Sequence, residues 1–293
     1  MTFPAAPDAP AGMQILESEA DGNVVAFLSN LPFPTEGGTE SVFHLLTPGL
    51  DLTPRGPVVQ GPPRPLVVYV PGSAWLPQNL DRSVPRLAAF AEATGYAVAM
   101  VAYRPSTVAK APAQLHDLKA ALNHLQAEHA RWNLSADKVV LWGTSSGGHL
   151  VSLAGLTAEG GPDIAGVVNF FGPTDFRRMG DFPSVMDHNA PNSPESLVVG
   201  GPIQDPEFAE AVAAYNPLTY VDPDKPTPPF LLMHGDRDPL VPFNQSVLLY
   251  EALRDAGHDV TFYKLKDAGH GTRFFTPKPL AIVEAFMARV LGN

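Results

Sequence analysis

A serine flanked by glycines is the first candidate for chemistry in this sequence. Residues 143–147 read Gly-Thr-Ser-Ser-Gly and match G-x-S-x-G, in which the central serine is a nucleophile when a strand precedes the motif and a helix follows it. An apolar run ends at Trp142, and a helix is expected from Gly147 onward. Only Ser145 has glycine two residues away on each side. The pattern therefore predicts Ser145, and not Ser146, as the nucleophile.

A nucleophilic serine needs a base, and the base needs a carboxylate that orients it. In strand–serine–helix enzymes these partners follow the serine in the order acid, then histidine. His270 lies between two glycines in the loop after an apolar strand at 260–265. Ligands bind at the carboxyl ends of the strands in such sheets, so we predict that His270 is the base.

Two aspartates compete for the role of the acid. Asp238 precedes Pro239 and an apolar anchor in the loop after a strand at 229–234, whereas Asp236 stands next to an arginine. The firmer backbone favours Asp238 as the catalytic acid and leaves Asp236 to organise the turn. Asp267, three residues before the histidine, is interpreted as a solvated turn residue.

The tetrahedral intermediate of such a reaction needs two N–H donors for its oxyanion. One is expected from Ser146, the residue after the nucleophile, and the other from the loop after the strand at 66–70. That loop begins Pro-Gly-Ser-Ala-Trp at residue 71, and its small residues let the backbone approach a carbonyl oxygen. We predict that Ser73 and Ala74 supply the donors.

Aromatic residues near these loops are candidates for substrate binding. The candidates are Trp75, Phe171, Phe176 and Phe182, and for Trp75 core packing is an equal alternative. His149 is interpreted as a packing histidine and His234 as a support for the acid loop. No H-E-x-x-H motif occurs and the chain has no cysteine, so we expect no metal and no disulfide. No cofactor is expected, because no glycine-rich nucleotide motif is present.

Strands and helices alternate through most of the chain. Strands are expected at 66–70, 96–102, 138–142, 164–170, 229–234 and 260–265, and helices at 84–94, 112–132, 147–158, 244–256 and 277–291, with strand-like stretches at 23–28 and 41–46. This order predicts an α/β fold, with a mostly parallel central sheet and helices on both faces. We expect one domain over residues 1–293.

The alternation breaks at residues 172–224, which are rich in proline, aspartate and serine but include several aromatic residues. A segment of that length in a compact domain is typical of an insertion over an active site. We interpret it as a cap, and its proline content favours a rigid wall over a moving lid.

Composition excludes several classes of protein. The 293 residues include 30 acidic and 19 basic side chains, which give a net charge of −11 and argue against binding to nucleic acid. No apolar run is long enough to cross a membrane. The N-terminal residues do not resemble a signal peptide, so we expect a cytoplasmic protein. A homo-oligomer is compatible with these features.

The motifs together resemble the α/β-hydrolase superfamily over the span from about residue 41 to the C-terminus. The likeness rests on residues 71–75, 103–104, 143–149, 171–175, 192–196, 200–201, 234–242 and 269–271. It is closest to the bacterial feruloyl and acetyl-xylan esterases and the hormone-sensitive-lipase-like enzymes. The chain departs from the usual oxyanion loop, because Pro71 stands where relatives carry histidine and Ser73 and Ala74 replace glycines.

The resemblance implies a serine carboxylesterase that acts on a small-molecule ester. It suggests small aryl or short-chain acyl esters, with feruloyl or acetyl groups on plant polysaccharide fragments as the leading candidates. The alternatives are a serine peptidase of related fold, which usually carries a large extra domain, and a ligand-binding pseudo-hydrolase that has lost a catalytic residue.

Overall fold

A central eight-stranded sheet organises the chain. The computed structural model describes residues 24–53, 56–59, 61–158 and 160–292. The strand order is β1-β2-β6-β5-β7-β8-β9-β10. The strands are β1 (Val25–Pro34), β2 (Glu40–Pro48), β5 (Arg64–Val70), β6 (Ala97–Val101), β7 (Leu134–Thr144), β8 (Asp163–Phe170), β9 (Phe230–Gly235) and β10 (Val260–Leu265). In this sheet only the β1–β2 and β2–β6 pairs are antiparallel, so the prediction of a mostly parallel sheet is confirmed.

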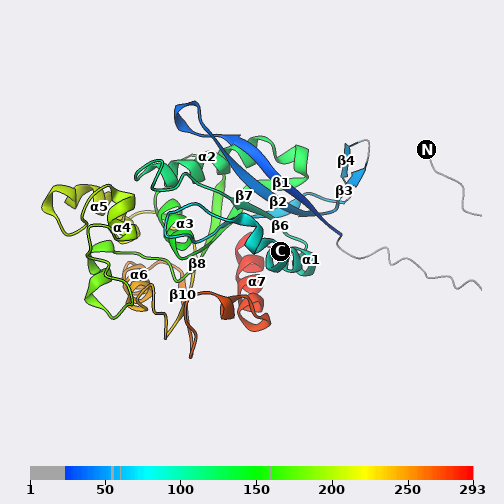
Figure 1. Cartoon of the computed structure of the whole chain (residues 1–293). Coiled ribbons are helices and arrows are strands. Elements are labelled where there is room, and N and C mark those ends of the chain that lie inside the picture. The colour runs from blue at the N-terminus through cyan, green and yellow to red at the C-terminus, as the bar shows by residue number, and fades with distance from the viewer. Residues whose placement is uncertain (1–23, 54–55, 60, 159, 293) are drawn as a thin grey trace, which may run out of the picture.

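Helices cover both faces of this sheet (Figure 1). One face carries α2 (Ala113–Ala127), α3 (Ser146–Leu156) and α6 (Asn244–Asp255), and the other carries α1 (Val84–Thr94) and α7 (Pro277–Leu291). The predicted helices at 84–94 and 277–291 have these same bounds. Gly95 ends α1 in the left-handed conformation, at φ 73°, which glycine adopts without steric cost.

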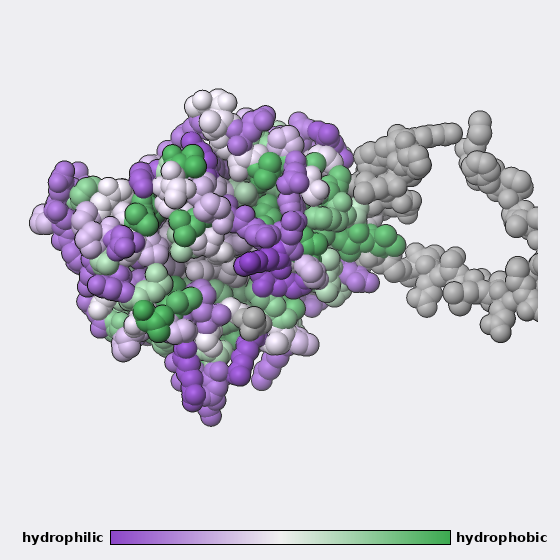
Figure 2. All heavy atoms as spheres, viewed as in Figure 1, coloured by the Kyte–Doolittle hydropathy of each residue, from purple (hydrophilic) through white to green (hydrophobic). Residues whose placement is uncertain are grey.

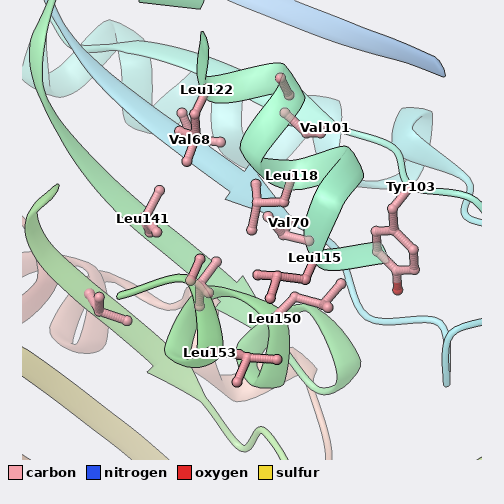
Figure 3. Packing of buried hydrophobic residues seen from close by; sticks show 14 of the residues in the cluster. Val68, Val70, Val101, Tyr103, Leu115, Leu118, Leu122, Leu141, Leu150 and Leu153 are labelled. Carbon is pink, nitrogen blue, oxygen red and sulfur yellow. The ribbon is translucent and has the colours of Figure 1, made fainter. Parts of the chain in front are cut away.

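The sequence pattern accounts for the two cores. In β5, Leu66, Val68 and Val70 belong to the core on the α2 and α3 side, while Val67 and Tyr69 belong to the core on the α1 and α7 side. Side chains alternate along a strand, so a continuous apolar run supplies both faces at once. The leucines that α2 presents every three or four residues (Leu115, Leu118, Leu122 and Leu125) pack on the first of these cores, and Figure 3 shows the first three of them.

Some element boundaries differ from the expectation. The strand expected at 23–28 continues as β1 to Pro34, past a register shift between Leu28 and Leu31. The helix expected at 112–132 ends at Ala127, and a 3-10 helix (His129–Trp132) follows it. A small hairpin of β3 (Leu50–Thr53) and β4 (Gly56–Val59) lies in the proline-rich stretch before β5. The start of the strand predicted at 23–28 lies outside the described residues.

The segment between β8 and β9 consists of short helices. They are η4 (Phe176–Asp181), α4 (Pro194–Val199), η5 (Pro206–Phe208), α5 (Ala209–Tyr215) and η6 (Pro217–Tyr220). Most of their buried apolar side chains, including Phe176, Val198 and Tyr215, belong to the core on the α2 and α3 side, and α4 and α5 lie beyond α3 in Figure 1. Ser184 Oγ and the Val185 N–H both donate to the Pro239 carbonyl, at 3.1 and 2.8 Å. The segment is thereby tied to the predicted acid loop, and its interpretation as a cap stays a prediction.

The described surface is mixed in polarity. Hydrophilic and hydrophobic residues alternate in small groups over the face in Figure 2. Among the helices of the described residues, none combines the length and the apolar character that a membrane span requires.

Candidate active site

Ser145 occupies a sharp turn between β7 and α3. Its backbone has φ 54° and ψ −126°, a conformation that is costly for a residue with a side chain. The neighbouring glycines make the turn possible: a Cβ on Gly143 would collide with the Gly147 carbonyl, and one on Gly147 would collide with the Val70 carbonyl. The strand–turn–helix setting predicted for the motif is present, and the turn lifts the Ser145 side chain to the carboxyl end of the sheet.

His270 and Asp238 form a hydrogen-bonded pair. His270 Nδ1 lies 2.7 Å from Asp238 Oδ2, and the other carboxylate oxygen accepts the N–H groups of Leu240 and Val241 at 2.9 and 3.0 Å. The Asp238 side chain is 0% exposed and that of His270 is 18% exposed. Burial alone would raise the pKa of Asp238, but the hydrogen bonds from His234 and His270 hold it below its usual value. A carboxylate that stays ionised can orient the imidazole and stabilise its charged form.

His234 supports the same carboxylate from the other side. Its Nε2 lies 3.0 Å from the Val241 carbonyl oxygen, which can only accept, so Nε2 carries the proton. Nδ1 then accepts from Ser246 Oγ at 2.8 Å, and Asp238 Oδ2 is 3.3 Å from Nε2. The fully buried ring holds the acid loop, as the sequence indicated.

Asp236 organises the turn and does not touch His270. Its Oδ1 accepts the Asp267 N–H at 2.7 Å. Asp267 in turn pairs with Arg237 at 2.6 Å on the surface. The carboxylate bonded to His270 is therefore that of Asp238.

Ser145 and His270 line one cavity of about 340 Å³ at the carboxyl ends of the parallel strands. The cavity is lined by Gly72, Ser73, Ala74, Arg86, Thr144, Ser145, Phe171, Leu240, His270, Gly271 and Phe275. The hydrogen bonds of the described residues do not include one between Ser145 and His270; in free enzymes such bonds are often long and tighten with substrate. A larger cavity of about 740 Å³ opens at the opposite ends of the strands, beside Lys138 and Asp163, and holds none of these groups.

The predicted oxyanion donors differ in what they already bind. The Ser73 N–H donates to Ser146 Oγ at 2.9 Å. Ala74 adopts φ 55°, and no hydrogen bond between described residues uses its N–H. A second candidate N–H comes from Ser146, at the start of α3. Ala74 and Ser146 thus fit the donor role better than Ser73, whose N–H is engaged in holding the loop to α3.

A buried network behind this loop escaped the sequence analysis. The Tyr103 hydroxyl lies 3.0 Å from both Ser73 Oγ and Ser146 Oγ, and Gln78 Oε1 accepts the Tyr103 N–H at 3.0 Å. Burial raises the pKa of Tyr103 to about 12, against the opposing effect of its bonds to Ser146 and Ser73. Tyr103 therefore stays neutral and can donate. The hydroxyls of Ser73 and Ser146 are thus both bound by this one phenol.

Only part of the predicted aromatic lining faces the cavity. Phe171 lines it, and its ring centroid lies 4.4 Å from that of His270. The structure places Trp75 and Phe176 in the interior instead, at 1% and 0% exposure. Both pack around the His149 ring, with centroid distances of 5.2 and 5.1 Å. Phe182 is half-buried and does not line the cavity.

His149 is a buried packing residue, as expected. Its Nε2 donates to the Tyr215 carbonyl at 2.7 Å. Burial lowers its pKa to about 4, although the bond to Tyr215 acts in the opposite direction. The neutral ring joins α3 to the segment that follows β8.

Among the described residues, no group of three or more histidines, aspartates or glutamates is arranged so that it could hold a metal ion.

Comparison with known proteins adds to this geometry. A family model described as BD-FAE matches residues 56–253. Among curated proteins, the chain is 26% identical to Esterase LipQ over 246 residues and 28% identical to the probable carboxylic ester hydrolase LipM over 228 residues, both from Mycobacterium tuberculosis. The matches cover 80% and 74% of this chain but 54% and 49% of those proteins. The chain thus spans about half the length of the curated relatives it matches.

Solved structures of similar fold include one described as a carbohydrate esterase. A truncated form of a carbohydrate esterase from gut microbiota is 25% identical, with a TM-score of 0.78, and the match covers 94% of this chain and 100% of that one. A bifunctional GH43-CE protein of Bacteroides eggerthii is 30% identical, with a TM-score of 0.74, over 90% of this chain and 38% of that one.

Proposed function

Because the chain belongs to the BD-FAE family and has an α/β-hydrolase fold, we propose that it is a carboxylic ester hydrolase that works through an acyl-enzyme. One observation carries the proposal: Ser145, in its strained turn, shares a cavity with a histidine whose second nitrogen is bonded to a buried carboxylate. This is the arrangement that nucleophilic catalysis by serine requires.

The steps follow from the positions of the groups. His270 Nε2 removes the hydroxyl proton of Ser145 as the oxygen attacks the ester carbonyl carbon, and Asp238 stabilises the imidazolium. The N–H groups of Ala74 and Ser146 bind the oxyanion. The C–O bond to the alcohol then breaks, and His270 gives the proton to the leaving oxygen. Water, activated by the same histidine, attacks the acyl-enzyme and releases the acid and free Ser145.

The substrate is proposed to be a small aryl or short-chain acyl ester, with feruloyl or acetyl groups on plant polysaccharide fragments as the leading candidates. The size of the cavity, about 340 Å³, suits a single small acyl or aryl group. The names of the two similar structures, a carbohydrate esterase and a bifunctional GH43-CE protein, support the carbohydrate part of this proposal. Phe171, beside the catalytic histidine, is the apolar surface we expect a substrate to contact.

A panel of esters tests the function. Initial rates are compared for p-nitrophenyl acetate, butyrate and octanoate, methyl ferulate and acetylated xylan, with the wild type and Ser145→Ala. We expect hydrolysis of the short-chain or feruloyl esters, and a loss of roughly 10⁵–10⁶ in turnover in Ser145→Ala because the covalent route is gone. Wild-type rates no higher than those of Ser145→Ala on every ester would refute the proposal.

A further inference from the structure

Among the described residues that line the cavity, Arg86 is the one that is permanently charged. It belongs to the first turn of α1, which lies on the opposite face of the sheet from α3. None of the ion pairs between described residues involves Arg86. The Asp238 carboxylate has a fully buried side chain and is bonded to His270.

The guanidinium is held in place by neutral partners. Its Cζ lies 4.0 Å from the centroid of the Phe275 ring, a cation–π contact, and Phe275 lines the same cavity. Nη2 donates to Ser83 Oγ at 2.9 Å and to Tyr69 Oη at 3.2 Å. These contacts fix the side chain without neutralising it.

Part of the donor capacity of Arg86 is unused. Nε is buried and has no hydrogen-bond partner in the described structure, and Nη1 appears in none of its hydrogen bonds. Buried polar groups are normally paired, and an arginine fork is suited to the two oxygens of a carboxylate. Arg86 is thus a fixed cation in the cavity that Ser145 lines. Among the described residues it has no carboxylate partner, and its Nη1 is left to bind an anion.

We propose that Arg86 selects ester substrates that carry a carboxylate near the scissile bond. The inference rests on the proposed function and narrows its substrate class to esters of acidic molecules, such as a hydroxy acid acylated on its hydroxyl or a dicarboxylic acid esterified at one end. The overall net charge of −11 argues against general attraction of anions as the source of such a preference, so the preference is assigned to this residue.

The experiment compares matched esters that differ in one carboxylate. On the acyl side, 4-nitrophenyl valerate is paired with the mono-4-nitrophenyl ester of adipic acid, and on the alcohol side, phenyl acetate is paired with 3-acetoxybenzoate. The measured quantity is the ratio of kcat/KM for the anionic ester to that for the neutral ester. Dividing the wild-type ratio by the ratio of a variant cancels the intrinsic reactivity of the esters.

In Arg86→Gln we expect the ratio of kcat/KM for the anionic ester to that for the neutral ester to fall by about 10- to 100-fold for at least one pair of esters. The reason is that the charge-assisted hydrogen bond between Arg86 and the substrate carboxylate is lost. Arg86→Lys should restore part of it, since the charge is kept. Arg82→Gln, which removes an exposed arginine of the preceding 3-10 helix (Leu80–Ser83), is the matched control and should leave the ratio as in the wild type.

Other outcomes overturn the inference in distinguishable ways. Equal losses on the neutral and anionic esters in Arg86→Gln would assign the residue a purely structural role. A ratio in Arg86→Gln equal to that of Arg82→Gln would show that Arg86 does not select the anion. If the wild type hydrolysed none of the four esters, the proposed function itself would fail together with the inference.

Discussion

Asp238 and Asp236, two residues apart, differ in what their carboxylates bind. Asp238 contacts His270, while Asp236 accepts the Asp267 N–H. Asp238→Asn presents an amide to His270 and disturbs its tautomer, so we expect kcat to fall by about 10⁴. Asp236→Asn keeps an oxygen that can accept the same N–H, and we expect a loss of less than about tenfold. Steady-state kinetics on a p-nitrophenyl ester measure both, and the reverse order would show that Asp238 is not the catalytic acid.

The candidate catalytic residues could be found from the sequence because each stands in a short local pattern. Ser145 has its glycines, and Asp238 and His270 each follow a recognisable strand. Arg86 has no such pattern. It reaches the cavity only because α1 packs beside the loop that carries Phe275, almost 190 residues later in the chain. The hydrogen bond from the Ser73 N–H to Ser146 Oγ also joins residues far apart in the chain. The sequence alone therefore could not show that the Ser73 N–H already has a partner and is the weaker oxyanion candidate.

At the level of elements, the helix η4 (Phe176–Asp181) links the segment after β8 to the core behind the oxyanion loop. The Phe176 ring contacts those of Trp75, His149 and Tyr215. Phe176→Ala should therefore lower the free energy of unfolding by about 3–5 kcal/mol, as expected for removing a buried phenylalanine. Urea unfolding measures the change. Phe182→Ala removes a half-buried ring of the same type and should cost less than half as much; equal costs would mean that Phe176 has no special role in this core.

Strongly amphipathic elements were predictable, and irregular ones were not. The helix α7 was placed to the residue, because its apolar stripe, early prolines and terminal glycine agree. For the edge strand β1, the sequence predicted only the first part. The pattern is interrupted at Asn30, which has φ 52° and lies where the register shifts. The His44 side chain stabilises that irregularity by accepting the Asn30 N–H at 3.1 Å. Such a long-range contact leaves no periodic signal in the sequence.

For the whole molecule, buried histidines link stability to pH in opposite directions. The pKa of His149 is lowered to about 4, so below about pH 6.5 the unfolded chain binds a proton that the folded chain excludes, and stability is lost as the pH falls. For His188, burial opposes the charged form, but the bond to Glu195 and other contacts raise its pKa. Protonated His188 therefore stabilises the fold at low pH. This contribution is lost as the pH rises through the pKa that His188 has in the folded protein.

Comparing variants isolates the contribution of His149. Between pH 7 and pH 5 we expect the free energy of unfolding of the wild type to fall by about 2 kcal/mol more than that of His149→Gln. His129→Gln, at an exposed position, should follow the wild type. Urea unfolding at pH 5, 6 and 7 gives the slopes, and parallel slopes for the wild type and His149→Gln would contradict the assignment of a neutral buried ring.

The central claim, that Ser145 forms the acyl-enzyme, is tested most directly by covalent labelling. The protein is treated with a fluorophosphonate ester, which reacts with activated serines, and the modified residue is located by fragmentation mass spectrometry of the peptide that contains both Ser145 and Ser146. We predict one adduct, on Ser145, that is absent from Ser145→Ala and still present in Ser146→Ala. An adduct on Ser146 or on any other residue, or ester hydrolysis that continues without an adduct, would contradict the account.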